Sequence, residues 1–170
     1  MAFNHLVLLG GGHTNVLLLK KWLMNPEMIP ECPISIISRE SHLVYSAMFP
    51  SVISKSIIFN EALIDINLLA NQLKINFIKE EASWIDFKRE EIFFRNRPKI
   101  NFSSLVLNVG SQTKIIGKFA ELVRKNIACP IKPFLKAYDF IALEDNNDKS
   151  NELPFVIVGS GLAAVEVAFA

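Results

Sequence analysis

Short apolar runs alternate with helix-forming segments along the first eighty residues. Leu6–Leu9, Ile34–Ile37 and Ile75–Ile78 are apolar runs of strand length, and the segments between them, His13–Met24 and Asp65–Leu73, carry residues that suit helices. The second of these helices begins with Asp65, a residue type preferred at helix N-caps. Strands that alternate with helices predict an α/β fold in which the strands lie in a parallel central sheet.

Further β-type runs follow. Ser83–Phe87 and Glu91–Arg95 are joined by a charged turn at residues 88–90, and Ser104–Val109 ends at Gly110. Bounded runs of this length and composition predict three more strands.

The first strand runs directly into glycines at the start of a helix. Gly10 and Gly12 fill the first two glycine positions of the spacing G-x-G-x-x-G/A, and Asn15 stands at the third. Glycines at this spacing let a diphosphate reach bare backbone amides at a helix N-terminus, where the helix dipole favours negative charge. Asn15 replaces the small residue that permits close helix–strand packing, so we expect this helix to lie slightly farther from its strand.

The same design returns at the end of the chain. The apolar run Phe155–Val158 predicts a buried strand, and residues 162–170 suit a helix. The three positions of the G-x-G-x-x-G/A fingerprint are filled by Gly159, Gly161 and Ala164. A tight strand–helix turn without a ligand has the same pattern, so both interpretations stay open on spacing alone.

Polar residues stand at the end of the second predicted strand. In a dinucleotide-binding fold, an acid at this point bonds the ribose hydroxyls. Either Glu40 takes that part or Ser38 bonds the ribose more weakly, and Arg39 is placed to lie along the adenine or a phosphate. An ordinary polar strand exit explains each residue, taken singly, equally well.

The composition limits the function classes. The 170 residues are 51% hydrophobic and 21% charged, which is enough for a globular core, and the net charge of +1 gives no basis for nucleic-acid binding. Pro154, the second glycine turn and Glu166 interrupt the apolar C-terminal stretch, so no transmembrane segment is predicted. The small number of cysteines indicates a reducing compartment, so we expect a cytoplasmic protein. For a longer parent protein, a peripheral location at the membrane stays open.

The cysteines and histidines give little chemistry. Cys32 and Cys129 lack the neighbour of a redox pair; Cys32 suits a structural role, and a redox role for Cys129 stays open. The three histidines do not form a metal site, and His13 stands in the glycine turn, where its ring would pack on or bond to a cofactor. No side chain is singled out as a catalytic acid or base.

The order of INFIKEEASWIDF, EIFF and FSSLVLNVGSQT resembles the pyridine nucleotide-disulfide oxidoreductase superfamily. Within its type II NADH dehydrogenase-like branch, GGGHTNV, ISRESHLVYSAMFP and PIKPF resemble the flavoprotein module that is fused to selenide, water dikinase (selenophosphate synthase). The resemblance covers nearly the whole chain. It implies a Rossmann-like FAD/NAD(P)-binding fold with a central parallel sheet and a small β-meander.

The resemblance also implies the cofactor contacts, with FAD in the first nucleotide-binding unit and NAD(P)H in the second. The apolar segment 42–57, which Pro50 makes too broken for a clean helix, commonly lies against the flavin in such proteins, and Gly110 matches a glycine that touches FAD. Glu166 matches an acid near the nicotinamide. The candidate cofactor-binding residues are Gly10, Gly12, His13, Asn15, Ser38, Arg39, Glu40, Ser46, Ala82, Gly110, Gly159, Gly161, Ala164 and Glu166.

Three segments are expected on this basis: an FAD-binding domain over residues 1–117, a connecting segment with a helix and the polar linker Glu144–Glu152 over 118–152, and the first strand–helix unit of an NAD(P)H domain over 153–170. We therefore expect an N-terminal fragment, inactive alone, of a longer flavoprotein. The implied activity is hydride transfer from NAD(P)H to flavin and on to a quinone or another acceptor. The alternatives are a non-catalytic nucleotide-binding or regulatory module that serves a fused or separate selenophosphate synthase, and a remnant that binds no cofactor.

Overall fold

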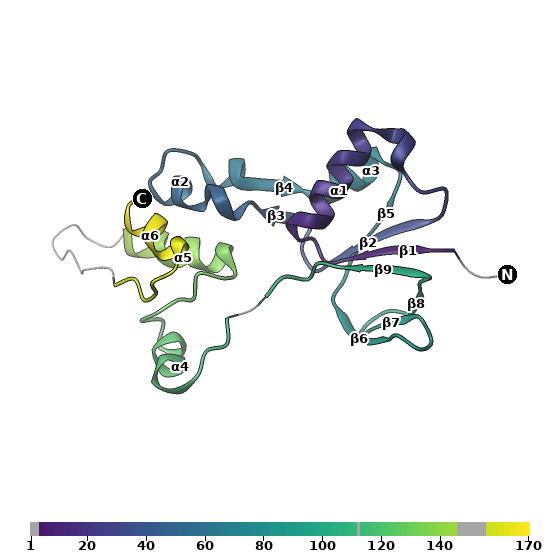
Figure 1. The fold of residues 1–170 in the computed structure, drawn as a ribbon. Helices are drawn as coiled ribbons and strands as arrows, with labels where there is room; N and C mark the ends of the chain where they lie inside the picture. Colours follow the sequence, from purple (N-terminus) through teal and green to yellow (C-terminus); the bar gives the residue numbers. More distant parts are fainter. Residues whose placement is uncertain (1–3, 112, 146–155) are drawn as a thin grey trace. The chain divides into compact units, whose positions relative to one another are not determined.

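The computed structural model describes residues 4–111, 113–145 and 156–170, and the chain divides into two compact units. The first unit comprises Met1–Leu43 and Ile64–Gly110, and the second comprises Val44–Leu63 and Ser111–Ala170. The first unit carries the parallel sheet, and the described part of the second is mainly helical (Figure 1).

The first unit is built on a four-stranded sheet in the order β5-β2-β1-β9. Its strands are β1 (Leu6–Leu9), β2 (Ile34–Ser38), β5 (Asn76–Lys79) and β9 (Ser104–Leu107), and every neighbouring pair is parallel. All five residues of β2 are buried, as a strand covered on both faces requires. The predicted α/β class with a parallel central sheet and a Rossmann-like fold is confirmed.

Two helices cover one face of this sheet (Figure 1). They are α1 (His13–Met24) and α3 (Ile66–Gln72), which begins after Asp65, whose carboxylate accepts the Leu68 N–H at 2.9 Å as an N-cap. Leu8 and Ile36 point to this side because side chains alternate along a strand. The buried residues of this cluster are Leu8, Val16, Leu19, Trp22, Ile34, Ile36, Ile66, Ala70 and Ile75.

An antiparallel sheet covers the other face. Its strands are β6 (Ala82–Asp86), β7 (Glu91–Phe94) and β8 (Ile100–Asn101), which pair in the order β6-β7-β8 and form the expected meander. The alternate side chains of the parallel strands pack against it. The buried residues of this second cluster are Val7, Leu9, Ile37, Ile78, Ile92, Phe94 and Phe102.

Aromatic side chains hold part of the second unit together. The rings of Phe49 and Phe134 lie 4.9 Å apart between centroids, and those of Phe59 and Tyr138 stack at 4.5 Å. The helical elements of this unit are η2 (Ser46–Met48), α2 (Phe49–Ile53), η3 (Phe59–Ala62), α4 (Gly117–Arg124), α5 (Phe134–Asp145) and α6 (Leu162–Ala168). The remaining elements are η1 (Pro26–Met28) and the paired strands β3 (His42–Val44) and β4 (Leu63–Asp65).

One local prediction is wrong. Val156–Val158 do not form a strand, because a parallel strand needs a hydrogen-bonded neighbour and none of the described strands pairs with them. The prediction that residues 42–57 form no clean helix is confirmed, since they hold β3, η2 and the short helix α2. Pro50 lies in the first turn of α2, where a missing N–H removes no helical hydrogen bond. Phe155 and, from residue 146 on, the predicted polar linker lie outside the described residues.

Candidate functional site

The carboxyl ends of the parallel strands bring polar residues to one edge of the sheet. Gly10 follows β1, Ser38 ends β2, Glu80 follows β5 and Asn108 follows β9. The chain leaves β1 toward β2, whereas β9 returns to the opposite side of β1, so the direction of winding reverses between β1 and β9. Ligands of open α/β sheets bind in the crevice at such a switch point.

The glycine turn lies at this switch point and is closely packed. Gly10 has φ +100°, and a Cβ atom there would stand 2.2 Å from the carbonyl oxygen of Asn108. A Cβ atom on Gly12 would stand 2.1 Å from Asn108 Oδ1. The two fingerprint glycines are therefore required by the chain's own contact with Asn108, whether or not a ligand binds.

Gly11, which the fingerprint leaves unspecified, is equally constrained. A Cβ atom on Gly11 would stand 2.4 Å from Ile66 Cδ1 and 2.6 Å from Ser38 Oγ. The side chain of Ser38 thus faces the glycine turn, and the residue is 6% exposed. Of the two residues considered for ribose binding, Ser38 is the one that the structure places against the turn.

Asn108, the residue after β9, caps helix α1. Gly12, the N-cap position, has no side chain, and Asn108 Oδ1 accepts the Thr14 N–H at 3.0 Å. The backbone oxygen of Asn108 accepts the Gly12 N–H at 3.2 Å. This residue is not among those predicted from the sequence. Sequence patterns for helix caps consider only residues close to the helix end, whereas Asn108 and Thr14 are 94 positions apart.

Asn15 fits inside the turn. Its side chain is fully buried, and its Nδ2 donates to the carbonyl oxygen of Gly10 at 2.8 Å. The carboxamide thereby joins the first turn of α1 to the end of β1, which a glycine or alanine at this position could not do. Asn15 Oδ1 is buried and has no hydrogen-bond partner.

The charges at this helix end suit an anion. The first turn of α1 contains no acidic residue, so the positive end of the helix dipole is not neutralised from within the helix. Thr14 is exposed and His13 is half-buried. The exposed Thr14 marks the solvent side of the turn.

The edge continues from the glycine turn to β5. The Ser38 carbonyl accepts the Glu80 N–H at 3.0 Å, and the Arg39 guanidinium lies 3.4 Å from a Glu40 carboxylate oxygen and 3.8 Å from one of Glu81. These three charged side chains are more than half exposed, so their ion pairs add little to stability. They form a polar rim beside Ser38.

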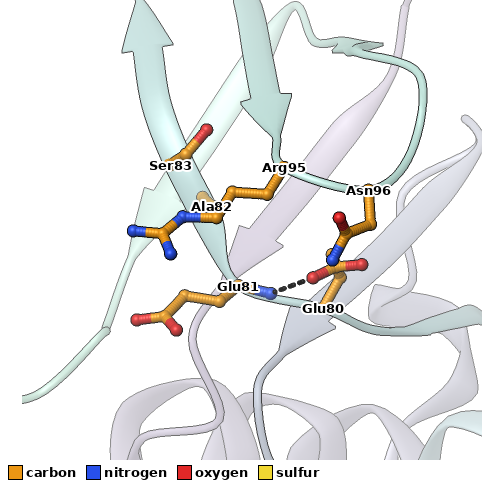
Figure 2. A pocket seen from close by; sticks show the side chains of 6 residues that line it. All are labelled: Glu80, Glu81, Ala82, Ser83, Arg95 and Asn96. Carbon is orange, nitrogen blue, oxygen red and sulfur yellow. Dashed lines mark hydrogen bonds between the residues drawn. The ribbon is translucent and has the colours of Figure 1, made fainter.

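A pocket of about 410 Å³ opens at the end of this rim. It is lined by Glu80, Glu81, Ala82, Ser83, Arg95 and Asn96, from the β5–β6 connection, the start of β6 and the residues that follow β7. Figure 2 shows the Arg95 side chain extending past Ala82, with its guanidinium on the same side of the pocket as the Glu81 carboxylate. The lining offers both hydrogen-bond donors and acceptors, which suits a polar heterocycle better than a simple anion.

Two further candidates lie apart from the glycine turn along the chain. Gly110 has φ +75° and open space where a side chain would project. Ser46 is half-buried at the start of η2 in the second unit.

The second glycine turn is open. Gly161 is the N-cap of α6, and a Cβ atom there would meet no neighbour within 4 Å. Gly159 does approach Ala164, whose Cβ would lie 3.5 Å from an added Cβ, so the first and third fingerprint positions are in contact. Glu166 is exposed on α6, and Val156 and Val158 are 80% and 79% exposed.

Neither cysteine has the setting of a redox nucleophile. Burial raises the pKa of the Cys129 thiol, and the positive charge of Lys136 offsets this only in part. A raised pKa keeps the thiol protonated at neutral pH, which lowers its nucleophilicity. Cys32 is a half-buried free cysteine that packs at the helix-side core. Within the described ranges, no group of three His, Cys, Asp or Glu side chains could hold a metal ion, and no helix is long and apolar enough to span a membrane.

Comparisons with known proteins identify the fold. No protein-family model and no curated protein matches the sequence. The sulfide:quinone oxidoreductase of Aquifex aeolicus matches 64% of this chain and 25% of its own at 24% identity, with a TM-score of 0.56. The NADH:rubredoxin oxidoreductase of Clostridium acetobutylicum matches 66% of this chain and 29% of its own at 23% identity, with a TM-score of 0.52.

A third structure widens the range of proteins with this fold. A chain in the mitochondrial ATP synthase of Tetrahymena thermophila matches 86% of this chain and 36% of its own at 13% identity, with a TM-score of 0.56. The match spans well under half the length of each of the three proteins. At these identities the likeness establishes the shared fold, and function has to be argued from the site.

Proposed function

We propose that this chain supplies the FAD-binding part of an NAD(P)H-dependent flavin oxidoreductase. The observation that carries the proposal is the glycine turn between β1 and α1 at the switch point of the parallel sheet. Two of the proteins with the same fold are named as oxidoreductases, one acting with a quinone and the other with NADH, which supports the reaction class.

The residues present fit the diphosphate of a dinucleotide. Helix α1 has 12 residues and no acid in its first turn, so its N-terminus attracts a diphosphate. Gly10 and Gly12 bring the backbone close to that helix end, and Asn15 fixes the turn through the Gly10 carbonyl oxygen. His13 starts α1 and is proposed to contact the cofactor from there.

The adenosine end is proposed to run along the polar rim toward the pocket. Ser38 and Glu40 offer oxygens to ribose hydroxyls, and Arg39 offers a positive charge beside them. Ala82 lines the pocket, where a purine edge would meet both donors and acceptors. The flavin end is proposed to contact Gly110 in the first unit. Ser46, in the second unit, stays a separate candidate for cofactor binding.

FAD, when bound, supplies the hydride-accepting chemistry, and the protein's part is to bind and orient it. The second glycine turn, with Gly159, Gly161, Ala164 and Glu166, is proposed to begin the NAD(P)H-binding domain, so the boundaries at residues 117 and 152 remain proposals. A quinone or another acceptor would take the electrons. Selenophosphate synthase is proposed as a fused or separate partner.

A non-catalytic nucleotide-binding module is the second candidate. Among the described residues, only the first glycine turn has a sheet beneath it, and nucleotide binding at that turn is what both candidates share. FAD binding is common to both candidates. Reduction of the bound flavin by NADH or NADPH, measured in a protein that also carries the complete NAD(P)H-binding domain, separates them.

Binding of FAD compared with riboflavin tests the proposal. Because the glycine turn and the rim would hold the diphosphate and the adenosine, we expect FAD and ADP to bind at least about tenfold more tightly than riboflavin. Isothermal calorimetry on the purified protein measures the three affinities. Equal affinity for FAD and riboflavin, or no binding of either FAD or ADP, would contradict the proposal.

A further inference from the structure

Backbone donors at the N-terminus of α1 are already used by the protein itself. The first N–H groups of a helix have no acceptor within the helix, and they are the groups that bind a phosphate. Here the Gly12 N–H and the Thr14 N–H donate to the backbone oxygen and to Oδ1 of Asn108. A phosphate oxygen at Thr14 would therefore have to take the place of the Asn108 side chain.

We propose that Asn108 is a placeholder for the phosphate: its Oδ1 caps α1 in the unliganded protein and gives way to a phosphate oxygen when a dinucleotide binds. This inference rests on the proposed function. It adds that, without a ligand, a side chain of the protein itself occupies the phosphate position of the same site. A charged phosphate oxygen is a stronger acceptor than a carboxamide oxygen, so the exchange is favourable. Asn108 is half-buried, which leaves its side chain room to turn away, and its backbone bond to Gly12 does not depend on that side chain.

Asn15 leaves a second polar group of this turn without its full set of hydrogen bonds. Among the described residues, Asn15 Oδ1 and Glu91 Oε2 are the buried side-chain polar atoms without a partner. Asn15 is fully buried and bonds the same turn through Gly10. An unpaired buried acceptor is rare in proteins, so this turn does not satisfy its own hydrogen bonds fully in the unliganded state.

Competition between Asn108 and the phosphate predicts effects of opposite sign. Asn108→Ala removes Oδ1 but keeps the backbone oxygen, so the unliganded protein loses a cap while the ligand loses a competitor. Loss of a cap is worth ~1 kcal/mol, so FAD and ADP should bind about fivefold more tightly, and the unfolding midpoint without ligand should fall. Asn108→Asp keeps the acceptor and adds a negative charge, so the unliganded protein should be at least as stable, and both ligands should bind about tenfold more weakly.

The experiment measures unfolding midpoints and calorimetric affinities for FAD and ADP on the wild-type protein and on both variants. Asn101→Ala is the matched control, because it removes an exposed asparagine side chain from β8, away from the glycine turn. The control should change neither affinity.

Each outcome decides a separate point. If the wild-type protein binds FAD but Asn108→Ala binds it equally or more weakly, the placeholder is wrong while the proposed function stands. If Asn108→Ala does not fold, the Asn108→Asp variant decides. If that variant binds FAD and ADP as tightly as the wild type or more tightly, the inference is overturned. If neither FAD nor ADP binds to any of these proteins, both the inference and the proposed function are overturned.

Discussion

Replacing Gly10 with alanine is expected to destabilise the protein by about 3 kcal/mol, which combines backbone strain with overpacking. Gly10 has φ +100°, a conformation that side chains with a Cβ rarely adopt. The added Cβ would also stand 2.2 Å from the Asn108 carbonyl oxygen and 2.7 Å from the Val109 Cα, and these backbone atoms can move only if β9 shifts. Urea unfolding followed by tryptophan fluorescence, to which the buried Trp22 of α1 contributes, measures the loss.

Gly110→Ala is the matched control. Gly110 also has a positive φ, +75°, but an added Cβ would meet nothing within 4 Å. The free energy of unfolding of this variant should therefore fall only by the cost of backbone strain, about 1 kcal/mol. Equal losses at Gly10 and Gly110 would show that the contact with Asn108 does not constrain the turn.

Thr14→Glu is expected to weaken FAD binding at least about tenfold while leaving the protein as stable as before or slightly more stable. Thr14 is exposed in the first turn of α1, so a carboxylate there gains from the helix dipole. The same carboxylate would stand where the diphosphate is proposed to bind, and like charges repel. Calorimetric titration with FAD, beside urea unfolding, separates the two effects.

Thr14→Gln controls for the size of the new side chain. It is nearly isosteric with glutamate and carries no charge, so its FAD affinity should stay within about twofold of the wild type. The difference between the Glu and Gln variants should also shrink as salt is added, because exposed charges are screened. Equal FAD affinity of the two variants would place the diphosphate away from this helix end.

The parallel sheet and its helices could be predicted from the sequence, because the apolar and polar residues within each segment already indicate a strand or a helix. Leu6–Leu9 and His13–Met24 have in the structure the bounds that the apolar pattern predicted. Asp65 caps α3 as its residue type predicts. In the first unit, local pattern and tertiary packing agree, so local reasoning was sufficient.

The remaining features depend on contacts that no local pattern contains. The cap that Asn108 provides joins residues 94 positions apart, and the requirement for glycine at Gly11 comes from Ile66 and Ser38. Val156–Val158 have a strand-like composition, but a strand also needs a neighbour to pair with. Such residues become visible only when the tertiary structure places their partners.

Amide chemical shifts of isotope-labelled protein, recorded during titration with FAD, test the proposed dinucleotide site most directly. If FAD binds along the carboxyl edge of the sheet, the largest shifts should fall on the amides of residues 10–15, with a second group at 38–40 and 80–83. The Thr14 amide should move most, because its acceptor changes from Asn108 to a phosphate oxygen. Saturable binding that leaves residues 10–15 unperturbed, or no perturbation at all, would contradict the site.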